Sequence, residues 1–281
     1  MNETFKASNY VIYEKNRIFI DICEEGCGSG CKYCYVQSKD KDQKLLSIKQ
    51  IKSICEYIYD NYMGRIKILS LCPNTEPLKS KESIESVQYI ISFFQKTDCY
   101  IQISTKEIVP YDFLKKINSY GNQIYINISI PVINNPMIEP KARTVDERIR
   151  NFQYMHLFKN INFSLYIKPF FKQETDKYFE IINKYKIETV YIGPVFNQKS
   201  EIPCTSLYDK KQCINIICNQ EKEINDFMLK LRSFTKANVF ISSVCKIYND
   251  YGTQCPYIFL GNNHSLCQDC KLKGEKNEQI A

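Results

Sequence analysis

The sequence predicts an α/β fold built on a mostly parallel sheet, and three observations lead to this prediction. The chain has 281 residues, which is long enough to bury a large core. Short apolar runs alternate along it with amphipathic stretches of helical spacing. Several of these runs are apolar almost throughout, as strands covered on both faces are. Strand–helix units in succession indicate parallel strands joined by right-handed crossovers.

The expected strands are rich in Ile, Val, Tyr and Phe. They cover residues 17–22, 65–71, 100–105, 123–130, 162–170, 189–195 and 238–243. The expected helices cover residues 47–63, 80–97, 110–120, 144–158, 175–186 and 221–236. Ser47, Ser80, Thr144 and Thr175 suit helix N-caps, and Pro110 suits a first helical position. This pattern is compatible with an open doubly wound sheet and with a full or partial barrel.

The composition is that of an ordinary globular enzyme-sized chain. Apolar residues make up 44% of it, charged residues 25%, and the formal net charge is +7. The positive side chains are dispersed, so charge alone gives little support to nucleic-acid binding. The sequence shows neither a signal-peptide core nor an apolar run long enough to span a membrane. We therefore expect a cytoplasmic protein that does not associate with membranes.

Three cysteines lie close together just after the first expected strand. Cys27, Cys31 and Cys34 follow a C-x3-C-x2-C spacing, with Gly28 and Gly30 allowing tight turns between them. In a reducing compartment, clustered cysteines indicate metal ligands or catalytic groups. Soft thiolates suit zinc or iron–sulfur clusters. Structural zinc takes four ligands, so a zinc site here would need a distant cysteine or histidine, whereas a four-iron cluster on three cysteines keeps one iron open for chemistry.

The segment CGSGCKYC (residues 27–34) resembles the signature of the radical S-adenosylmethionine (radical SAM) superfamily, in which an aromatic residue such as Tyr33 usually precedes the last cysteine. The strand–helix order of residues 15–200 is similar to that family as well. The resemblance implies a [4Fe-4S] cluster with one open iron that binds S-adenosylmethionine. It also implies reductive cleavage of that cofactor to a 5′-deoxyadenosyl radical, which abstracts hydrogen from a substrate.

The resemblance further implies a partial (β/α)6 TIM-type barrel with a cysteine-containing C-terminal extension. We expect the barrel over residues 1–243, with an insertion at 197–219, and the extension over residues 244–281. Cys245, Cys255, Cys267 and Cys270 in the extension form a C-x9-C-x11-C-x2-C array. This array could bind an auxiliary iron–sulfur cluster, a structural zinc or no metal. Three further cysteines in the insertion, which we expect to be inert, are Cys204, Cys213 and Cys218.

The longer segment GCGSGCKYCYVQS (residues 26–38) is most similar to the spore photoproduct lyase-like branch of the superfamily. By this resemblance Cys72 would return hydrogen to a product radical, and Tyr35 would take part in radical relay. The alternative for Cys72 is a small buried residue of the core. Tyr33 would pack against the cofactor.

The resemblance also implies cofactor contacts at the ends of later strands. Glu76 would accept hydrogen bonds from the amino group of S-adenosylmethionine. The other candidates for binding this cofactor are Ser104, Lys106, Ser129, Arg143 and Gly193. The alternatives are solvated loop charges for Glu76 and Lys106, an ordinary strand residue for Ser129 and a surface position for Arg143.

These observations together predict a radical SAM enzyme that acts on a peptide or a nucleic acid and receives electrons from a donor such as flavodoxin or ferredoxin. The alternative is a non-enzymatic iron–sulfur or zinc module for binding or redox sensing. Repair of DNA photoproducts is the less favoured enzymatic activity, because the sequence shows no clear basic hairpin for gripping a duplex.

Overall fold

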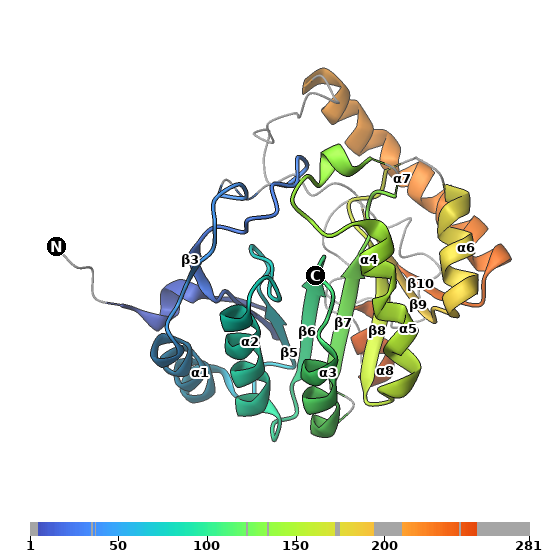
Figure 1. Cartoon of the computed structure of the whole chain (residues 1–281). Helices are drawn as coiled ribbons and strands as arrows, with labels where there is room; N and C mark the ends of the chain where they lie inside the picture. Colours follow the sequence, from blue (N-terminus) through green and yellow to red (C-terminus); the bar gives the residue numbers. More distant parts are fainter. Residues whose placement is uncertain are drawn as a thin grey trace, which may run out of the picture. The chain divides into compact units, whose positions relative to one another are not determined.

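The protein is described from a computed structural model, drawn in Figure 1. The described residues are 5–34, 36, 38–121, 123–133, 135–171, 175–193, 210–241 and 243–251. The chain divides into two compact units, Met1–Ser164 and Leu165–Ala281. Within the described residues, every helix is too short or too polar to cross a bilayer.

The strands of the first unit follow the order β1-β2-β5-β6-β7-β8. They are β1 (Val11–Glu14), β2 (Arg17–Ile20), β5 (Ile68–Leu71), β6 (Tyr100–Thr105), β7 (Ile124–Ser129) and β8 (Ile161–Ile167), which continues into the second unit. β1 pairs antiparallel with β2, whereas β2, β5, β6 and β7 pair in parallel. A separate antiparallel pair, β3 (Cys23–Glu25) and β4 (Lys44–Leu45), brackets the segment that carries the three clustered cysteines.

Three helices of the first unit begin at the predicted capping residues, and Pro110 directly precedes a fourth helix instead of being its first residue. The helices of this unit are α1 (Ile48–Tyr62), α2 (Lys81–Phe94), α3 (Tyr111–Ile117), α4 (Val145–Ile149) and α5 (Asn151–Tyr154), with short 3-10 turns at Ala7–Tyr10, Asn118–Tyr120, Pro136–Ile138 and Met155–Leu157. Ser47, Ser80 and Thr144 each cap a helix through a reciprocal capping box. Figure 1 shows α1, α2 and α3 side by side along one face of the strands.

The two faces of the strands in the first unit differ in polarity. Isoleucines occupy alternate positions of β6 and β7 and are fully buried, as expected for a face covered by helices. The opposite positions carry polar side chains that are hydrogen bonded across strands. The Asn127 amide donates to Ser104 (3.0 Å) and accepts from Ser164 (2.6 Å). Ser70 similarly donates to Gln102 on the next strand (3.3 Å).

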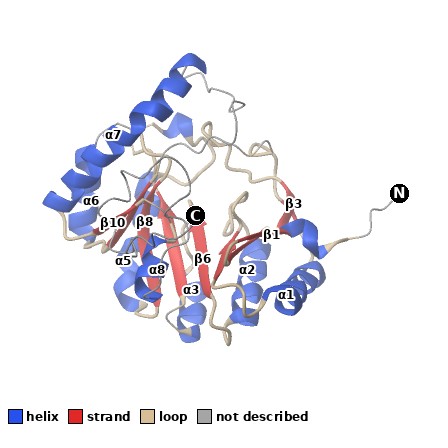
Figure 2. Ribbon diagram, turned by 180° about the vertical axis from the view of Figure 1, so that it is seen from behind, coloured by secondary structure: helices blue, strands red, loops and turns tan. Residues whose placement is uncertain are grey.

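The second unit contains the end of β8, followed by β9 (Thr189–Ile192) and β10 (Asn238–Phe240), all paired in parallel. Its helices are α6 (Thr175–Tyr185), α7 (Lys210–Phe234) and α8 (Cys245–Tyr251). α6 and α7 contact each other, as Figure 2 shows from behind. Phe227 on α7 stacks on Phe170 with ring centroids 4.9 Å apart, and this aromatic contact helps to form the core of the unit.

The predicted α/β class with a parallel sheet is confirmed, and the expected strands lie within a few residues of the observed ones. β1 was not predicted, although the short turn at Lys15, which has a φ of 57°, joins it to β2 as a hairpin. α7 begins at Lys210, inside the expected insertion at 197–219. α8 likewise occupies the start of the tail, which the sequence predicted to be irregular.

Candidate functional site

The clustered cysteines lie on a loop, residues 26–43, between β3 and β4, which we call the cysteine loop. Its backbone requires glycine at two places. Gly26 has a φ of 87°, and a Cβ atom there would lie 2.0 Å from the carbonyl oxygen of Asp42. Gly30 has a φ of 61°, and a Cβ there would lie 2.9 Å from Asp40 Oδ1. A larger residue at Gly26 would meet rigid backbone and prevent the loop from closing, whereas at Gly30 it would add the strain of a positive φ and displace the Asp40 side chain.

The thiols of the cysteine loop have neighbours that favour their ionised form. The Cys34 amide donates to the Cys31 carbonyl (3.0 Å), and the Val36 amide donates to the Cys34 sulfur (3.4 Å). Burial raises the pKa of Cys31 to about 11, while the charge of Lys106 acts in the opposite direction. Burial also raises the pKa of Cys34, against the effects of the Val36 amide and Lys106. An N–H donor and a nearby cation are groups that stabilise thiolate ligands.

Among the described residues, no three His, Cys, Asp or Glu side chains are placed to hold a single metal ion. A four-iron cluster makes a different demand, because each cysteine binds a different iron and the sulfurs stand apart. The charge of Cys34 interacts with those of Cys27 and Cys31, so the three thiols are electrostatic neighbours. The three thiols on one loop are a donor set that fits an iron–sulfur cluster.

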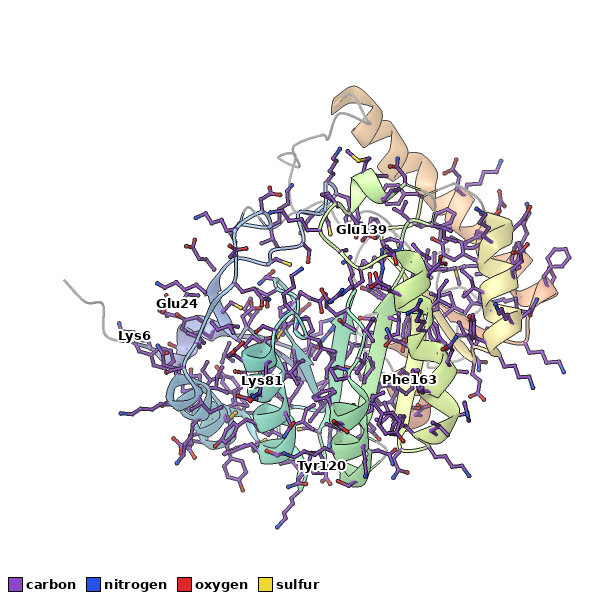
Figure 3. All side chains as sticks on the ribbon, in the orientation of Figure 1. Lys6, Glu24, Lys81, Tyr120, Glu139 and Phe163 are labelled. Atoms are coloured by element: carbon purple, nitrogen blue, oxygen red, sulfur yellow. The ribbon has the colours of Figure 1, made fainter. Side chains whose placement is uncertain are left out.

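Glu139 lies beside the cysteine loop, at the carboxyl-terminal end of the parallel strands and opposite Tyr120 (Figure 3). The Tyr33 hydroxyl donates to Glu139 Oε1, and the Cys31 sulfur lies 4.0 Å from the same oxygen. Arg148 Nη2 lies 2.7 Å from Glu139 Oε2, and Arg148 Nη1 donates to the Ser129 carbonyl (2.7 Å). The loop is thus connected to the end of β7 through a buried ion pair.

Glu76 follows β5 and is a buried carboxylate with several donors. The Thr105 hydroxyl donates to Oε1, and the backbone amide of Lys106 donates to Oε2 (2.9 Å). The Leu78 amide lies 3.4 Å from Oε1. Burial raises the pKa of Glu76, against the effect of these hydrogen bonds. A buried carboxylate of this kind can accept an ammonium group, which would relieve the cost of its burial.

Lys106 connects the Glu76 site with the cysteine loop. Its ammonium lies 3.9 Å from Glu139 Oε1 and 5.8 Å from the centre of the Tyr33 ring. Burial by itself would lower the pKa of Lys106, but the negative groups Cys31, Glu139 and Glu76 together hold that pKa above its ordinary value. Lys106 therefore stays positively charged between two carboxylates.

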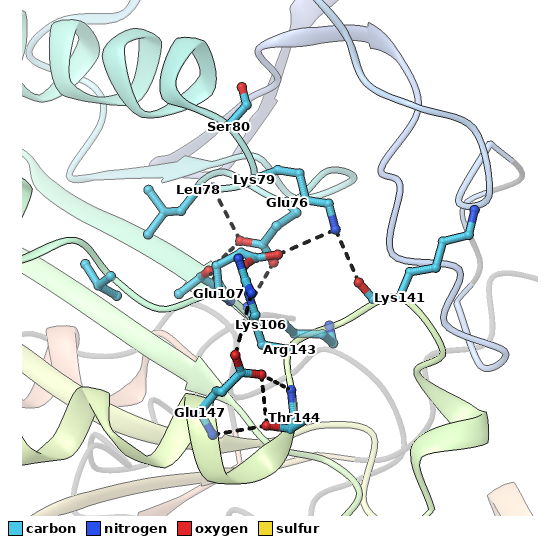
Figure 4. A network of polar contacts seen from close by, with 12 residues as sticks. Glu76, Leu78, Lys79, Ser80, Lys106, Glu107, Lys141, Arg143, Thr144 and Glu147 are labelled. Carbon is cyan, nitrogen blue, oxygen red and sulfur yellow. Dashed lines mark hydrogen bonds and ion pairs between the residues drawn. The ribbon is translucent and has the colours of Figure 1, made fainter.

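Figure 4 shows a second set of charges near Glu76. Glu107 is paired with Arg143 (Nε to Oε2, 2.8 Å) and with Lys79 (Nζ to Oε1, 3.5 Å). Arg143 also lies 3.6 Å from Glu147. The Lys79 ammonium donates to the Lys141 carbonyl (3.3 Å), beside the cysteine loop. The guanidinium of Arg143 is about half exposed, so its predicted contact with a carboxylate of the cofactor would compete with Glu107 and Glu147.

Cys72 directly follows β5 and has an unusual backbone conformation. Its φ is 57°, which is uncommon for a residue other than glycine. Its amide donates to the Ile20 carbonyl (2.7 Å), and its side chain is buried. Burial raises the pKa of Cys72 well above its ordinary value, and the charges of Asp21 and Cys23 act in the same direction. Cys72 is therefore a neutral thiol that retains its hydrogen.

The structure places the remaining predicted residues as follows. Ser104 belongs to the polar face of the strands, and Ser129 ends β7, with its carbonyl bound to Arg148. Gly193 follows β9 in the second unit, where a Cβ would lie 2.8 Å from the Lys168 side chain. Cys245 is the buried first residue of α8. Tyr35, Cys204, Cys255, Cys267 and Cys270 lie outside the described residues, and Cys213 and Cys218 lie on α7 without described side chains.

Sequence reasoning missed four residues of this site: Thr105, Glu107, Glu139 and Arg148. The connection that contains Glu139 and Arg148 was expected to contribute only Arg143. A carboxylate and a guanidinium nine positions apart give no sign of pairing, because the intervening turn decides whether they meet. Thr105 and Glu107 flank the predicted Lys106, and the end of a parallel strand was the one available indication of their role.

Comparison with known proteins identifies the family to which these features correspond. A family profile described as the radical SAM superfamily matches residues 23–185. That range includes the cysteine loop, Glu76, Lys106 and Glu139. No curated protein matches the sequence significantly.

Two kinds of solved structure are similar in fold. SuiB from Streptococcus suis, bound to S-adenosylmethionine, has a TM-score of 0.59 at 12% identity and covers 89% of this chain and 56% of its own. SuiB bound to the precursor peptide SuiA has a TM-score of 0.58 at 12% identity, and the match covers 87% of this chain and 52% of SuiB. Spore photoproduct lyase complexed with dinucleoside spore photoproduct has a TM-score of 0.56 at 16% identity, and the match covers 79% of this chain and 76% of the lyase. The chain thus spans about half the length of SuiB, and these likenesses support the predicted partial barrel.

Proposed function

Because the chain belongs to the radical SAM superfamily, we propose that it abstracts a hydrogen atom from a peptide by means of S-adenosylmethionine. The family implies an enzyme with a [4Fe-4S] cluster and this cofactor. Cys27, Cys31 and Cys34 would hold the cluster. When bound and reduced, the cluster supplies the electron that cleaves the cofactor to methionine and a 5′-deoxyadenosyl radical. Every other contribution comes from side chains that bind, orient and shield the reactants.

One observation carries the assignment of the cofactor site. Lys106 donates its backbone amide to Glu76 (2.9 Å), while its ammonium lies 3.9 Å from Glu139, which contacts Cys31. A buried carboxylate suited to an amino group is therefore linked through one residue to the cysteine loop. Glu76 would bind the amino group of the cofactor, and Lys106 would face its carboxylate.

Further cofactor contacts remain proposals. Arg143 would bind the carboxylate of the cofactor after releasing Glu107. Ser104 and Ser129 would contact the ribose of the cofactor. Gly193 and Tyr33 would supply apolar or backbone contacts, and Tyr35 would take part in radical relay.

A peptide is the substrate that we favour. The polar face of the strands carries amide and hydroxyl groups, such as those of Gln102, Asn127 and Ser164, and these groups are compatible with a polar substrate. SuiB has been crystallised with a precursor peptide. An external one-electron donor such as flavodoxin or ferredoxin would reduce the cluster.

A nucleic-acid substrate is the second candidate, and Cys72 is the observation that favours it. Its buried, neutral thiol at the end of β5 is suited to return a hydrogen atom to a product radical, as the sequence resemblance implies. Spore photoproduct lyase is also matched over 76% of its own length, more than SuiB.

We also propose that residues 244–281 form an extension whose cysteines, Cys245, Cys255, Cys267 and Cys270, bind an auxiliary cluster. The support is the C-x2-C pair at the end of the array. Anaerobic reconstitution followed by iron and sulfide analysis tests this proposal. The double variant C267A/C270A should lose the iron of one cluster and keep the rest, and an unchanged iron content would contradict the proposal.

The main experiment measures 5′-deoxyadenosine by mass spectrometry after anaerobic incubation of the reconstituted protein with dithionite and S-adenosylmethionine. The wild type should form it, and C27A/C31A/C34A should not. A binding or sensing module would form none at any iron content. Adding a mixture of short peptides should then accelerate its formation more than adding dinucleotides does. The reverse order would favour the second candidate.

A further inference from the structure

We propose that Glu139 is a positioning residue that fastens the cysteine loop to the end of β7 and sets the charge beside one cluster ligand. The charge-setting part rests on the proposed function, in which Cys31 is a cluster ligand. The fastening part concerns the folded chain itself and holds without a cluster.

Hydrogen bonds join the cysteine loop to the segment that contains Glu139. One lies near the end of the loop, where the Lys141 ammonium donates to the Asp40 carbonyl (3.2 Å), and two lie at its middle. The backbone amide of Lys32 donates to the Ile138 carbonyl (2.9 Å). The Tyr33 hydroxyl donates to Glu139 Oε1. The Lys32 bond is made by the backbone and is available to any side chain at position 32, so at the middle of the loop Glu139 and Tyr33 supply the contact that depends on sequence.

Glu139 is itself held from the opposite side. Arg148 uses Nη2 for Glu139 and Nη1 for the carbonyl of Ser129, the last residue of β7, both at 2.7 Å. The side chains of Glu139 and Arg148 are 2% and 3% exposed. Because the guanidinium bridges two partners instead of gripping one carboxylate with both ends, its geometry ties the carboxylate to the strand. Movement of the loop away from β7 would therefore require breaking either the Tyr33–Glu139 hydrogen bond or the desolvated ion pair behind it.

The same carboxylate determines the charge next to Cys31. Glu139 Oε1 lies 4.0 Å from the Cys31 sulfur and 3.9 Å from the Lys106 ammonium. Charges act strongly at this range where water is excluded. A fixed negative charge beside a cluster ligand opposes the addition of an electron, so Glu139 should make the cluster harder to reduce. Lys106 acts on Cys31 in the opposite direction and more strongly, so removal of the Glu139 charge would leave this cation without its nearest opposing carboxylate.

The test compares three variants with the wild type. Glu139→Gln removes the charge and keeps the size, and Tyr33→Phe removes only the hydroxyl that reaches Glu139. Glu107→Gln is the matched control, because Glu107 is also a buried carboxylate paired with two cations, Lys79 and Arg143. Amide hydrogen exchange of residues 31–34 is measured on the protein without iron. The midpoint potential is measured by anaerobic titration of the reconstituted protein.

We expect exchange at residues 31–34 to accelerate roughly tenfold in Glu139→Gln and in Tyr33→Phe, as the loss of one buried hydrogen bond predicts. Glu107→Gln should leave it unchanged. The midpoint potential should become less negative in Glu139→Gln and stay near the wild-type value in Tyr33→Phe and Glu107→Gln.

Wild-type exchange in Glu139→Gln would overturn the fastening role, and an unchanged potential would overturn the charge role. If Glu139→Gln accelerates exchange throughout the first unit, the effect is not specific to the cysteine loop, and Tyr33→Phe is used instead. Wild-type exchange at residues 31–34 in Tyr33→Phe would then overturn the fastening role. A wild-type protein that binds no iron contradicts the proposed function and with it the charge role, and the exchange comparison still decides whether Glu139 fastens the loop.

Discussion

Arg148 and Glu139 form an ion pair of 2.7 Å that is almost completely removed from solvent. Because neither charge contacts water in the folded protein, each needs the opposite charge of the other to offset the cost of its burial. Removing one partner of such a pair leaves an uncompensated buried charge, which costs more than the pair contributes. Lys106 is the remaining cation near Glu139, at 3.9 Å, and offers only part of the lost compensation.

Arg148→Met should therefore lower the free energy of unfolding by about 3–5 kcal/mol, as loss of one partner of a buried pair does. The double variant Glu139→Gln/Arg148→Met should recover a large part of this loss, because no isolated charge remains. Urea unfolding of the protein without iron, followed by circular dichroism, measures the two single variants and the double variant. If the losses of Arg148→Met and Glu139→Gln simply add in the double variant, Arg148 and Glu139 are not coupled as the structure indicates.

The loop glycines provide a second test. In Gly26→Ala a Cβ would meet the Asp42 carbonyl oxygen at 2.0 Å, a contact with rigid backbone. We expect the reconstituted variant to lose most of the iron that Cys27, Cys31 and Cys34 would bind, because the cysteine loop cannot close around it. Iron analysis after gel filtration gives the answer.

Gly64→Ala is the matched control for Gly26→Ala. Gly64 has a similar φ of 84°, but a Cβ there would meet nothing within 4 Å. Gly64→Ala should lower the free energy of unfolding only by the backbone strain of a left-handed alanine, about 1 kcal/mol. It should leave the iron content unchanged. Equal iron loss in both variants would mean that strain alone, and not the clash, governs the loop.

The sequence was sufficient for the parts of the fold that depend on local pattern. Apolar runs identified the parallel strands, and Ser47 and Ser80 marked the starts of α1 and α2. The cysteine spacing located the candidate cluster loop, because ligand spacing within one loop is a local property.

The rest of the site depends on contacts between distant segments. Glu139 reaches Tyr33, 106 positions away, only because the connection after β7 folds back on the cysteine loop. Arg143 was predicted to bind the cofactor, yet in the structure it is paired with Glu107, 36 positions away. Sequence pattern indicates which residues end a strand, but not which of their side chains meet.

The pH dependence of stability offers a test of Glu76. Burial raises the pKa of Glu76 in the folded protein above its ordinary value of 4.5. As the pH rises above that value, the unfolded chain loses its proton first, so the unfolded state is favoured and the free energy of unfolding falls. Glu76→Gln lacks this titration. The stability of the wild type relative to Glu76→Gln should therefore decrease from about pH 4.5 upward, measured by urea unfolding without the cofactor, and a constant difference would contradict the burial effect.

Binding of S-adenosylmethionine should depend on the charge of Glu76. The cofactor carries an ammonium, and a hydrogen bond between two charged groups contributes about 1.5–3 kcal/mol. Glu76→Gln should thus weaken binding by roughly 10- to 100-fold, measured by equilibrium dialysis with the reconstituted protein under anaerobic conditions. Glu85→Gln is the control, because Glu85 lies exposed on α2 in a surface pair with Lys81. If both variants bind like the wild type, the amino group of the cofactor lies elsewhere and Glu76 serves only to organise the turn around Thr105.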